Sequence, residues 1–415
     1  MKRARARDAR PSPSAIVDSL FPHNAHVIGG YDPLPLHSAD ASPHFHEIAA
    51  AHGTYAIRLQ RVGQAIAEDL LRALGRVGGA AHTLPAEGGV DLVVFASLPQ
   101  VEALRAQLLT ASNDLQRLAE EIATVLQAYH RTEFSLECKG RQLLCGLRPL
   151  TMGVINCTPD SFYDGSRLGD RAAAELGEQM VEAGADLLDV GGESTRPGSK
   201  MVSVQEEIDR VVPSIEALAS RVEVPISIDT SKAAVAEAAL TAGASIVNDV
   251  RGLAGDPDLG AVVAAAGVPI ILMHTRGSSE RMQEEARYED LLADILMELR
   301  EALGRASRAG IGPEATLVDP GIGFAKSAQQ SLIVLRHLAA VRSLGRPIVI
   351  GPSRKSFIGE VLGLPADERL EGTAAAVACG VLAGAHMVRV HDVRSMRRVA
   401  CVAAAIRSEG VGWTS

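Results

Sequence analysis

Short apolar runs alternate with longer amphipathic stretches along most of this chain. From residue 151 onward, each apolar run ends in, or gives way within a few residues to, polar side chains, and a stretch with the 3.6-residue period of a helix follows. The runs predict eight strands, at residues 152–156, 186–190, 225–229, 245–249, 269–274, 315–319, 347–351 and 387–391. The stretches between them predict helices, chiefly at residues 172–183, 204–221, 232–242, 259–266, 291–309, 330–344, 373–383 and 395–408.

Eight β-α units within residues 151–415 have the size and rhythm of a (β/α)8 barrel. The rival fold is a doubly wound open sheet, which usually has fewer strands and a glycine-rich dinucleotide loop. No G-x-G-x-x-G sequence follows a predicted strand in this chain. We therefore expect an α/β fold of the (β/α)8 TIM-barrel type.

A smaller α/β pattern precedes the barrel. It predicts strands at residues 54–61 and 90–97, and helices at residues 63–74, 98–109 and 113–130. Two short runs at residues 134–138 and 141–145 flank Lys139-Gly140, which predicts a hairpin with the positive φ of its tight turn at the glycine. We predict a small α/β N-terminal domain of unknown role at residues 21–131, and the barrel with its leading hairpin at residues 132–415.

Composition and charge narrow the class of protein. With 47% hydrophobic residues, the 415-residue chain can bury a large core. No apolar run approaches the roughly 20 residues of a membrane span. The Arg-rich start precedes no uninterrupted apolar segment, so residues 1–20 are expected to be a disordered basic tail on a cytoplasmic protein. The net charge of −9 is spread without blocks, which argues against nucleic acid as a partner. The five cysteines include no CxxC pair, so they imply neither a disulfide framework nor a zinc site.

Polar side chains follow all eight predicted strands. In a barrel the carboxyl ends of the strands surround one mouth, where the chemistry is placed, and barrel stability needs no such ring of polar groups. The groups are Asn156; Glu193, Thr195 and Arg196; Asp229 and Thr230; Asn248 and Asp249; His274; Asp319; Ser353, Arg354 and Lys355; and Arg389, His391 and Asp392.

The ring of polar groups divides by charge. Its carboxylates and amide, on strands three, four and six, can accept paired N–H groups from a flat heterocycle, as they do from arginine. Its cations, on strand eight and the second loop, can hold a diphosphate. The ligand that this division favours is a heteroaromatic ring with a phosphorylated arm. The first set is Asp229, Asn248 and Asp319, and the second is Arg196, Arg389 and His391.

Eight ordered segments together resemble the dihydropteroate synthase family. The resemblance runs from Thr151 to about residue 407, and the N-terminal unit is similar to an extension found in some bacterial members. The segments are residues 152–166, residues 186–198, Asp229-Thr230-Ser231-Lys232, Asn248-Asp249, Met273-His274, residues 319–324, Ser353-Arg354-Lys355-Ser356 and residues 389–393.

The resemblance implies condensation of 6-hydroxymethyl-7,8-dihydropterin diphosphate with 4-aminobenzoate, which gives 7,8-dihydropteroate and diphosphate with magnesium assisting. By motif, Asp229, Asn248, Asp319 and Lys355 would grip the pterin, with Met273 as an apolar wall. Asn156 would coordinate the magnesium, while Arg196, Arg389 and His391 would hold the diphosphate. Thr195, Pro197, Phe324 and Ser356 would form the aminobenzoate pocket once the first two loops close. Asp160 and Asp164 match the family's first-loop acids.

The residue chemistry agrees with a dissociative reaction. The protein must stabilise negative charge leaving on oxygen and positive charge on the pterin methylene, and an aromatic amine needs no strong base because it is already uncharged. The residues expected to carry the reaction are Asp229, Asp319, Lys355 and Arg389. From the resemblance we also expect small-molecule substrates and a site that sulfonamides target. We expect a homodimer whose contact is formed by the last barrel helices.

Two other functions fit parts of the pattern. A pterin-binding domain of a corrinoid methyltransferase would share the barrel but would not need the diphosphate groups. A non-catalytic homologue would have eroded first and second loops, and both are complete here. Individual groups also have structural readings: Asp229-Thr230-Ser231 as a helix cap, His274 as a buried strand-end histidine, Lys355 as a solvated lysine, and Arg354 as a brace for its loop or a neighbour of aminobenzoate.

Overall fold

The computed structural model describes residues 23–30, 53–86, 88–146, 148–157, 167–194, 202–277 and 286–408. The tail expected at residues 1–20 lies outside these ranges. Among the described helices, none combines the length and the apolar character that crossing a membrane requires.

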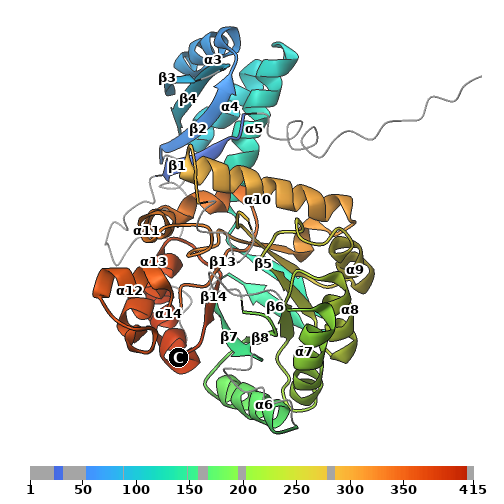
Figure 1. Cartoon of the computed structure of the whole chain (residues 1–415). Coiled ribbons are helices and arrows are strands. Elements are labelled where there is room, and N and C mark those ends of the chain that lie inside the picture. The colour runs from blue at the N-terminus through green and yellow to red at the C-terminus, as the bar shows by residue number, and fades with distance from the viewer. Residues whose placement is uncertain are drawn as a thin grey trace, which may run out of the picture.

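The larger part of the molecule is built around a closed ring of eight parallel strands (Figure 1). Neighbouring strands pair in chain order from β7 to β12, and β14 pairs with both β7 and β13. A parallel bridge between Val318 of β12 and Ile348, the residue just before β13, closes the ring. The (β/α)8 barrel is therefore confirmed. Its strands are β7 (Leu150–Asn156), β8 (Leu187–Gly191), β9 (Ile226–Asp229), β10 (Ile246–Asp249), β11 (Ile270–Met273), β12 (Thr316–Asp319), β13 (Val349–Ile350) and β14 (Met387–Val390).

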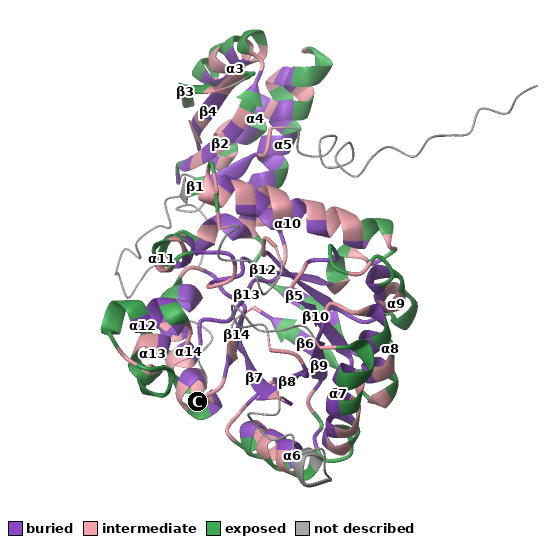
Figure 2. Cartoon of the chain, viewed as in Figure 1, coloured by how far each residue is buried: buried purple, intermediate pink, exposed green. Residues whose placement is uncertain are grey.

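Helices surround the strands, and the main core lies between the two layers, where Figure 2 shows the buried residues. Side-chain caps explain several helix starts: Ser203, Asp290 and Ser327 accept hydrogen bonds from backbone N–H groups in the first turns of their helices. The α-helices are α6 (Arg167–Glu182), α7 (Val204–Ala219), α8 (Ala233–Ala242), α9 (Leu259–Ala266), α10 (Leu291–Arg308), α11 (Ala328–Arg336), α12 (Ser356–Leu362), α13 (Leu370–Leu382) and α14 (Val393–Arg407).

The helix predicted at residues 330–344 is divided in the structure. The α-helix α11 ends at Arg336, and a 3-10 helix, η2 (Leu338–Leu344), follows it. Leu338, Val341 and Leu344 are all buried at three-residue spacing. A 3-10 helix places side chains at i and i+3 on one face, so this spacing buries all three against the core.

The predicted hairpin leads into the barrel and covers the end at which the barrel strands begin. Strands β5 (Phe134–Glu137) and β6 (Gln142–Cys145) pair around Lys139 and Gly140, both of which have positive φ. Phe134 and Leu136 pack with Leu150 and Leu187, which lie at the first residues of their barrel strands. The hairpin therefore covers the end of the barrel opposite the strand ends that carry the polar ring.

The N-terminal unit is a four-stranded antiparallel sheet with helices. The order is β1-β2-β4-β3, from β1 (His26–Gly30), β2 (Tyr55–Val62), β3 (Ala80–Ala86) and β4 (Gly89–Ala96), with helices α3 (Gln64–Arg76), α4 (Leu98–Leu108) and α5 (Asn113–His130). The sequence pattern predicted β2, β4 and the three helices but missed β1 and β3. Both are edge strands, and β1 contains two glycines while β3 is mostly exposed and contains Pro85, so neither alternates clearly.

Helix α10 lies between this unit and the barrel (Figure 1). Its Arg300 is buried and donates hydrogen bonds to the side chain of Asn24 and the backbone carbonyl of Ala25. Arg58 of β2 forms an ion pair with Asp290 at the start of α10. The η2 segment adds a contact in which the Arg342 guanidinium lies 4.3 Å from the ring centroid of Tyr129. Charged and polar contacts therefore seat the N-terminal unit on two barrel elements.

Candidate active site

Three strand residues form a charged cluster at the barrel mouth. Arg389 of β14 donates from Nε to Oδ2 of Asp189 at 2.6 Å, and from Nη2 to Oδ2 of Asp229 at 2.7 Å. Strands β8 and β9 supply the two carboxylates, and both are buried. The structure therefore brings the predicted acid Asp229 and the predicted cation Arg389 into direct contact.

Asp189 is a site residue that the sequence reasoning did not select. Besides binding Arg389, its Oδ2 accepts a hydrogen bond from Nδ2 of Asn248 at 3.1 Å. It has no solvent exposure. A buried carboxylate needs charged or hydrogen-bonding partners. The sequence did carry a signal for this residue, because Asp189 is an aspartate within the otherwise apolar run of β8. An aspartate in a strand that is covered on both faces requires such partners.

Burial and neighbouring charges shift the pKa values of Asp229 and Arg389. Burial raises the pKa of Asp229 to about 7, an effect that Arg389 opposes and that Asp189 reinforces. Burial disfavours the charge on Arg389, but Asp189 and Asp229 outweigh it and hold its pKa above the ordinary arginine value. In addition, Oδ1 of Asp229 is buried without a hydrogen-bond partner among the described residues. An acceptor in that state suits a ligand that brings N–H donors.

Asp319 and Lys355 form the second part of the site. Oδ1 of Asp319, at the end of β12, accepts a hydrogen bond from the backbone N–H of Gly321 at 2.7 Å. Burial raises the pKa of Asp319, while the nearby Lys355 lowers it. Burial also lowers the pKa of Lys355 to about 8, against the attraction of Asp319. The Lys355 ammonium donates to the carbonyl of Ile322 and lies 4.4 Å from the ring centroid of Phe324.

A third group follows β13 and β14. Oγ of Ser353 lies 3.0 Å from Nδ1 of His391 and accepts a hydrogen bond from the His391 backbone N–H at 3.3 Å. Arg354 pairs through two hydrogen bonds with Asp392, at 3.0 and 2.7 Å. This pair holds the β13 and β14 loops together, which supports the reading of Arg354 as a brace. Ser356 is exposed at the first residue of α12.

Other predicted residues take defined places or fall outside the described ranges. Met273 is buried at the end of β11. Asn156 ends β7 and is partly exposed. Thr195, Arg196 and Pro197 lie outside the described residues, as do the loop acids Asp160 and Asp164.

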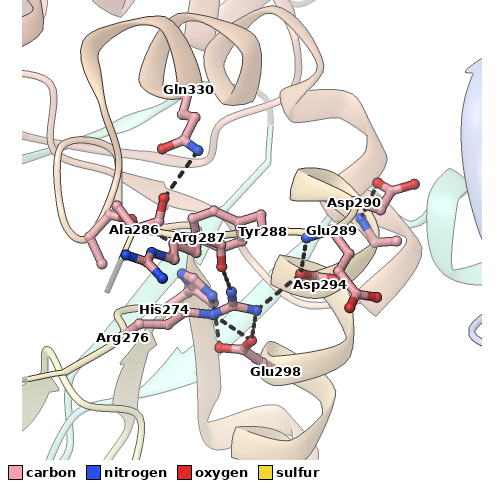
Figure 3. Close-up of polar contacts among 12 residues, drawn as sticks. His274, Arg276, Ala286, Arg287, Tyr288, Glu289, Asp290, Asp294, Glu298 and Gln330 are labelled. Carbon is pink, nitrogen blue, oxygen red and sulfur yellow. Dashed lines mark hydrogen bonds and ion pairs between the residues drawn. The ribbon is translucent and has the colours of Figure 1, made fainter. Parts of the chain in front are cut away.

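Two strand-end groups have structural partners. Asp249 accepts hydrogen bonds from Oγ of Ser231 at 2.5 Å and from the backbone N–H groups of Arg251 and Leu253 at 2.9 and 2.6 Å, so it orders the turn after β10. His274 is buried beside Lys326, with Nδ1 and Nζ 2.9 Å apart. Figure 3 shows the other side of this histidine, where Nε2 lies 3.1 Å from Oε2 of Glu298.

A parallel barrel whose mouth combines buried carboxylates, an amide and a shared guanidinium has the groups needed to bind a flat, donor-rich ring. The family model described as "Pterin binding enzyme" matches residues 152–391, which hold all of these groups. The dihydropteroate synthase of Bacillus subtilis is 45% identical over 264 residues, covering 63% of this chain and 90% of that protein.

Solved structures agree with this family match. Dihydropteroate synthase of Xanthomonas albilineans, solved with 4-aminobenzoic acid, is 41% identical with a TM-score of 0.62, covering 67% of this chain and 99% of that one. The Yersinia pestis enzyme, solved in a sulfonamide drug complex, is also 41% identical with a TM-score of 0.62, covering 66% of this chain and 100% of that one. This chain belongs to the dihydropteroate synthase family of pterin-binding enzymes.

Proposed function

We propose that this protein condenses 6-hydroxymethyl-7,8-dihydropterin diphosphate with 4-aminobenzoate to give 7,8-dihydropteroate and diphosphate. One observation carries the proposal: buried acceptors on β8, β9, β10 and β12 lie at the same barrel mouth as Arg389 and His391. A ring with several N–H groups and an anionic arm would satisfy both kinds of group.

The pterin ring would lie on the acceptor side of the mouth. The partnerless Oδ1 of Asp229 is a ready acceptor for a ring N–H group. Asn248 is held by Asp189, and Asp319 is held by the backbone of Gly321, so both reach the ligand from fixed positions. Met273 would supply the apolar wall, and Lys355, which lies near Asp319, would donate to the ring.

The diphosphate would lie on the cation side. Arg389 uses Nε and Nη2 to bind two carboxylates, which fixes the plane of its guanidinium while other N–H groups remain for an oxygen of the leaving group. His391 is oriented by Ser353 in the same part of the mouth. We assign Arg196 to this group as well, and Thr195, Pro197, Phe324 and Ser356 to the aminobenzoate side, by their motif positions.

The chain's own residues would favour a dissociative path. Asp229 and Asp319 place negative charge beside the ring, which favours the cation that forms as diphosphate leaves. Arg389 and His391 would take up the charge that develops on the departing oxygen. The amine of 4-aminobenzoate needs no buried base, because it attacks as the neutral amine and its proton can pass to water afterwards.

Magnesium would assist the departure of diphosphate. The residues present fit it: Asn156 offers an amide oxygen, and Mg²⁺ typically takes one or two protein oxygens together with substrate phosphates. Among the described residues, no group of three or more His, Cys, Asp or Glu could hold a metal ion. Bound there, the ion would neutralise part of the phosphate charge.

We also propose that the protein is a homodimer joined through its last barrel helices. Val402 and Ile406 on α14 are 61% and 63% exposed, and Leu382 on α13 is 43% exposed. These two helices are neighbours, so their apolar side chains can form one contact surface. The cytoplasmic location expected from the sequence stays a prediction.

The synthase assay tests the proposal directly. Purified protein with magnesium is expected to release diphosphate only when both the pterin diphosphate and 4-aminobenzoate are present. Release at the same rate without the amine would make the protein a hydrolase instead. Sulfonamides are expected to compete with 4-aminobenzoate; the similar Yersinia pestis enzyme was solved in a sulfonamide drug complex.

A further inference from the structure

Lys326 is a buried lysine to which the proposed reaction gives no role. Its side chain lies next to the β12 end of the mouth, and the residue is 2% exposed. Its ammonium contacts three groups: the carbonyls of Gly321 and Phe324, each at 3.0 Å, and Nδ1 of His274 at 2.9 Å. Burying a lysine is costly, and these three contacts use all three of its donors.

The contacts fix a backbone segment with an unusual course. Between Asp319 and Lys326, positive φ values occur at Gly321 (68°), Gly323 (82°) and Ala325 (45°). A Cβ atom at Gly321 would lie 1.9 Å from the carbonyl oxygen of His274, so the segment packs directly against the end of β11. Such a course turns carbonyls away from the sheet ladder, and they need other donors.

Two lysines supply those donors. Lys326 binds the carbonyls of residues 321 and 324, and Lys355 binds the carbonyl of Ile322 between them. The segment therefore carries Phe324 on a backbone held by two ammonium groups. Since the Lys355 ammonium lies 4.4 Å from the Phe324 ring centroid, the course of this segment sets the positions of two proposed substrate-binding residues.

His274, which directly follows β11, contacts the Lys326 ammonium. Its Nδ1 faces an ammonium, which can only donate, so Nδ1 must be the acceptor and Nε2 carries the ring proton. Nε2 lies 3.1 Å from Glu298 of α10, and Glu298 also pairs with Arg276 (Figure 3). Burial lowers the pKa of His274 to about 4, with Lys326 adding to the effect, which keeps the imidazole neutral. A neutral, oriented imidazole is the partner that a buried ammonium requires.

We propose that Lys326 is a positioning residue of the pterin site, holding the segment of residues 321–324 so that Phe324 and Lys355 meet the substrate in a fixed arrangement. It acts mainly through these residues. Burial lowers the pKa of Lys326 to about 7, with Asp319 opposing the effect, and in its charged form Lys326 lowers the pKa of Asp319. The inference rests on the proposed synthase function, and it assigns a role to a residue outside the substrate contacts.

The test compares Lys326→Met, which removes the charge and the donors at similar length, with Lys326→Gln, which retains donors without the charge. The matched control is Lys139→Met, because Lys139 also donates to a carbonyl, that of Leu240, at the opposite end of the barrel. Equilibrium binding of the pterin diphosphate with magnesium, without aminobenzoate, is measured for each variant. Amide hydrogen exchange of residues 320–325 is measured in the free proteins.

We expect Lys326→Met to weaken pterin binding at least tenfold and to speed exchange of residues 320–325 at least tenfold, with Lys326→Gln intermediate and Lys139→Met unchanged. The acidic limb of the kcat/KM profile, to which both Asp229 and Asp319 contribute, is also expected to move to higher pH in both Lys326 variants, because Asp319 loses a neighbouring cation. A merely structural loss would lower the profile without moving it. Unchanged binding, exchange and pH limb in Lys326→Gln would overturn the proposal, even if Lys326→Met failed to fold. An inactive wild-type protein would count against the synthase function, whereas the exchange result would still decide the role of Lys326.

Discussion

Nη2 of Arg389 lies 2.7 Å from Oδ2 of Asp229, so the two charged halves of the predicted ligand site meet in a single ion pair. The same guanidinium binds Asp189 through Nε at 2.6 Å. Pterin and diphosphate would therefore share a boundary residue. Because both carboxylates fix the guanidinium plane, the position of the leaving group is tied to the position of the ring.

Arg389→Met should cost both stability and activity. Removing the guanidinium leaves Asp189 and Asp229 buried without their cation, and breaking a buried pair in this way costs about 3–5 kcal/mol. Denaturant unfolding measures the loss. Arg354→Met is the control at the same mouth, because the more exposed Arg354 and Asp392 pair should contribute only about 0–1 kcal/mol. Equal losses in the two variants would contradict the central place given to Arg389.

Lys355→Ala should weaken pterin binding and turnover with little loss of folding. A hydrogen bond to a charged group is worth about 1.5–3 kcal/mol, so kcat/KM for the pterin diphosphate should fall roughly tenfold to a hundredfold. Steady-state kinetics and the thermal midpoint are measured together. Kinetics equal to those of the wild type would refute the assignment of Lys355 to the site.

The pH profile should show Lys355 losing its charge. Its pKa is lowered from the ordinary lysine value to about 8, so the ammonium is charged below that pH and neutral above it. We expect kcat/KM for the pterin diphosphate to fall as pH rises through about 8. Lys355→Arg keeps the charge at higher pH, so its remaining activity should not show this decline. A decline at the same pH in Lys355→Arg would assign the titration to another group.

Arg300→Leu should loosen the N-terminal unit from the barrel. The substitution leaves the carbonyl of Ala25 and the side chain of Asn24 without this donor, and the buried carbonyl of Ala25 left unsatisfied costs about 1–3 kcal/mol. Limited proteolysis near residue 131 and denaturant unfolding should both report the change. Arg308→Leu is the control, because Arg308 is exposed on the same helix. Equal protease resistance in the two variants would argue against Arg300 as a docking residue.

Ile406→Glu should yield a monomer if α13 and α14 form the proposed dimer contact. A charge placed in a buried apolar contact is costly, whereas on a free surface it is tolerated. Light scattering across a range of concentrations measures the mass. The exposed Leu109 of the N-terminal unit supplies the control substitution, Leu109→Glu, which should leave the mass unchanged. A dimer that persists in Ile406→Glu would move the contact elsewhere.

The pattern of apolar runs was sufficient to predict the barrel because every strand is covered on both faces and reads as a continuous apolar segment. Asp229, Asn248, Asp319 and Arg389 lie at or near the carboxyl ends of those runs, so the single direction of parallel strands predicted them at one mouth. The sequence pattern missed β1 and β3, since an edge strand with glycines or an exposed face carries little periodic signal.

The sequence by itself determined the order of the β-α units and the chemical groups at their ends, because both follow from local periodicity and from the single direction of parallel strands. Only the tertiary structure decided which of those groups bind one another. Asp189 and Arg389 lie 200 residues apart along the chain, yet their side chains form an ion pair across the barrel mouth. The contact between Lys326 and His274 likewise exists only once β11 and β12 are neighbours, since the pairing of side chains depends on where the closed barrel directs them.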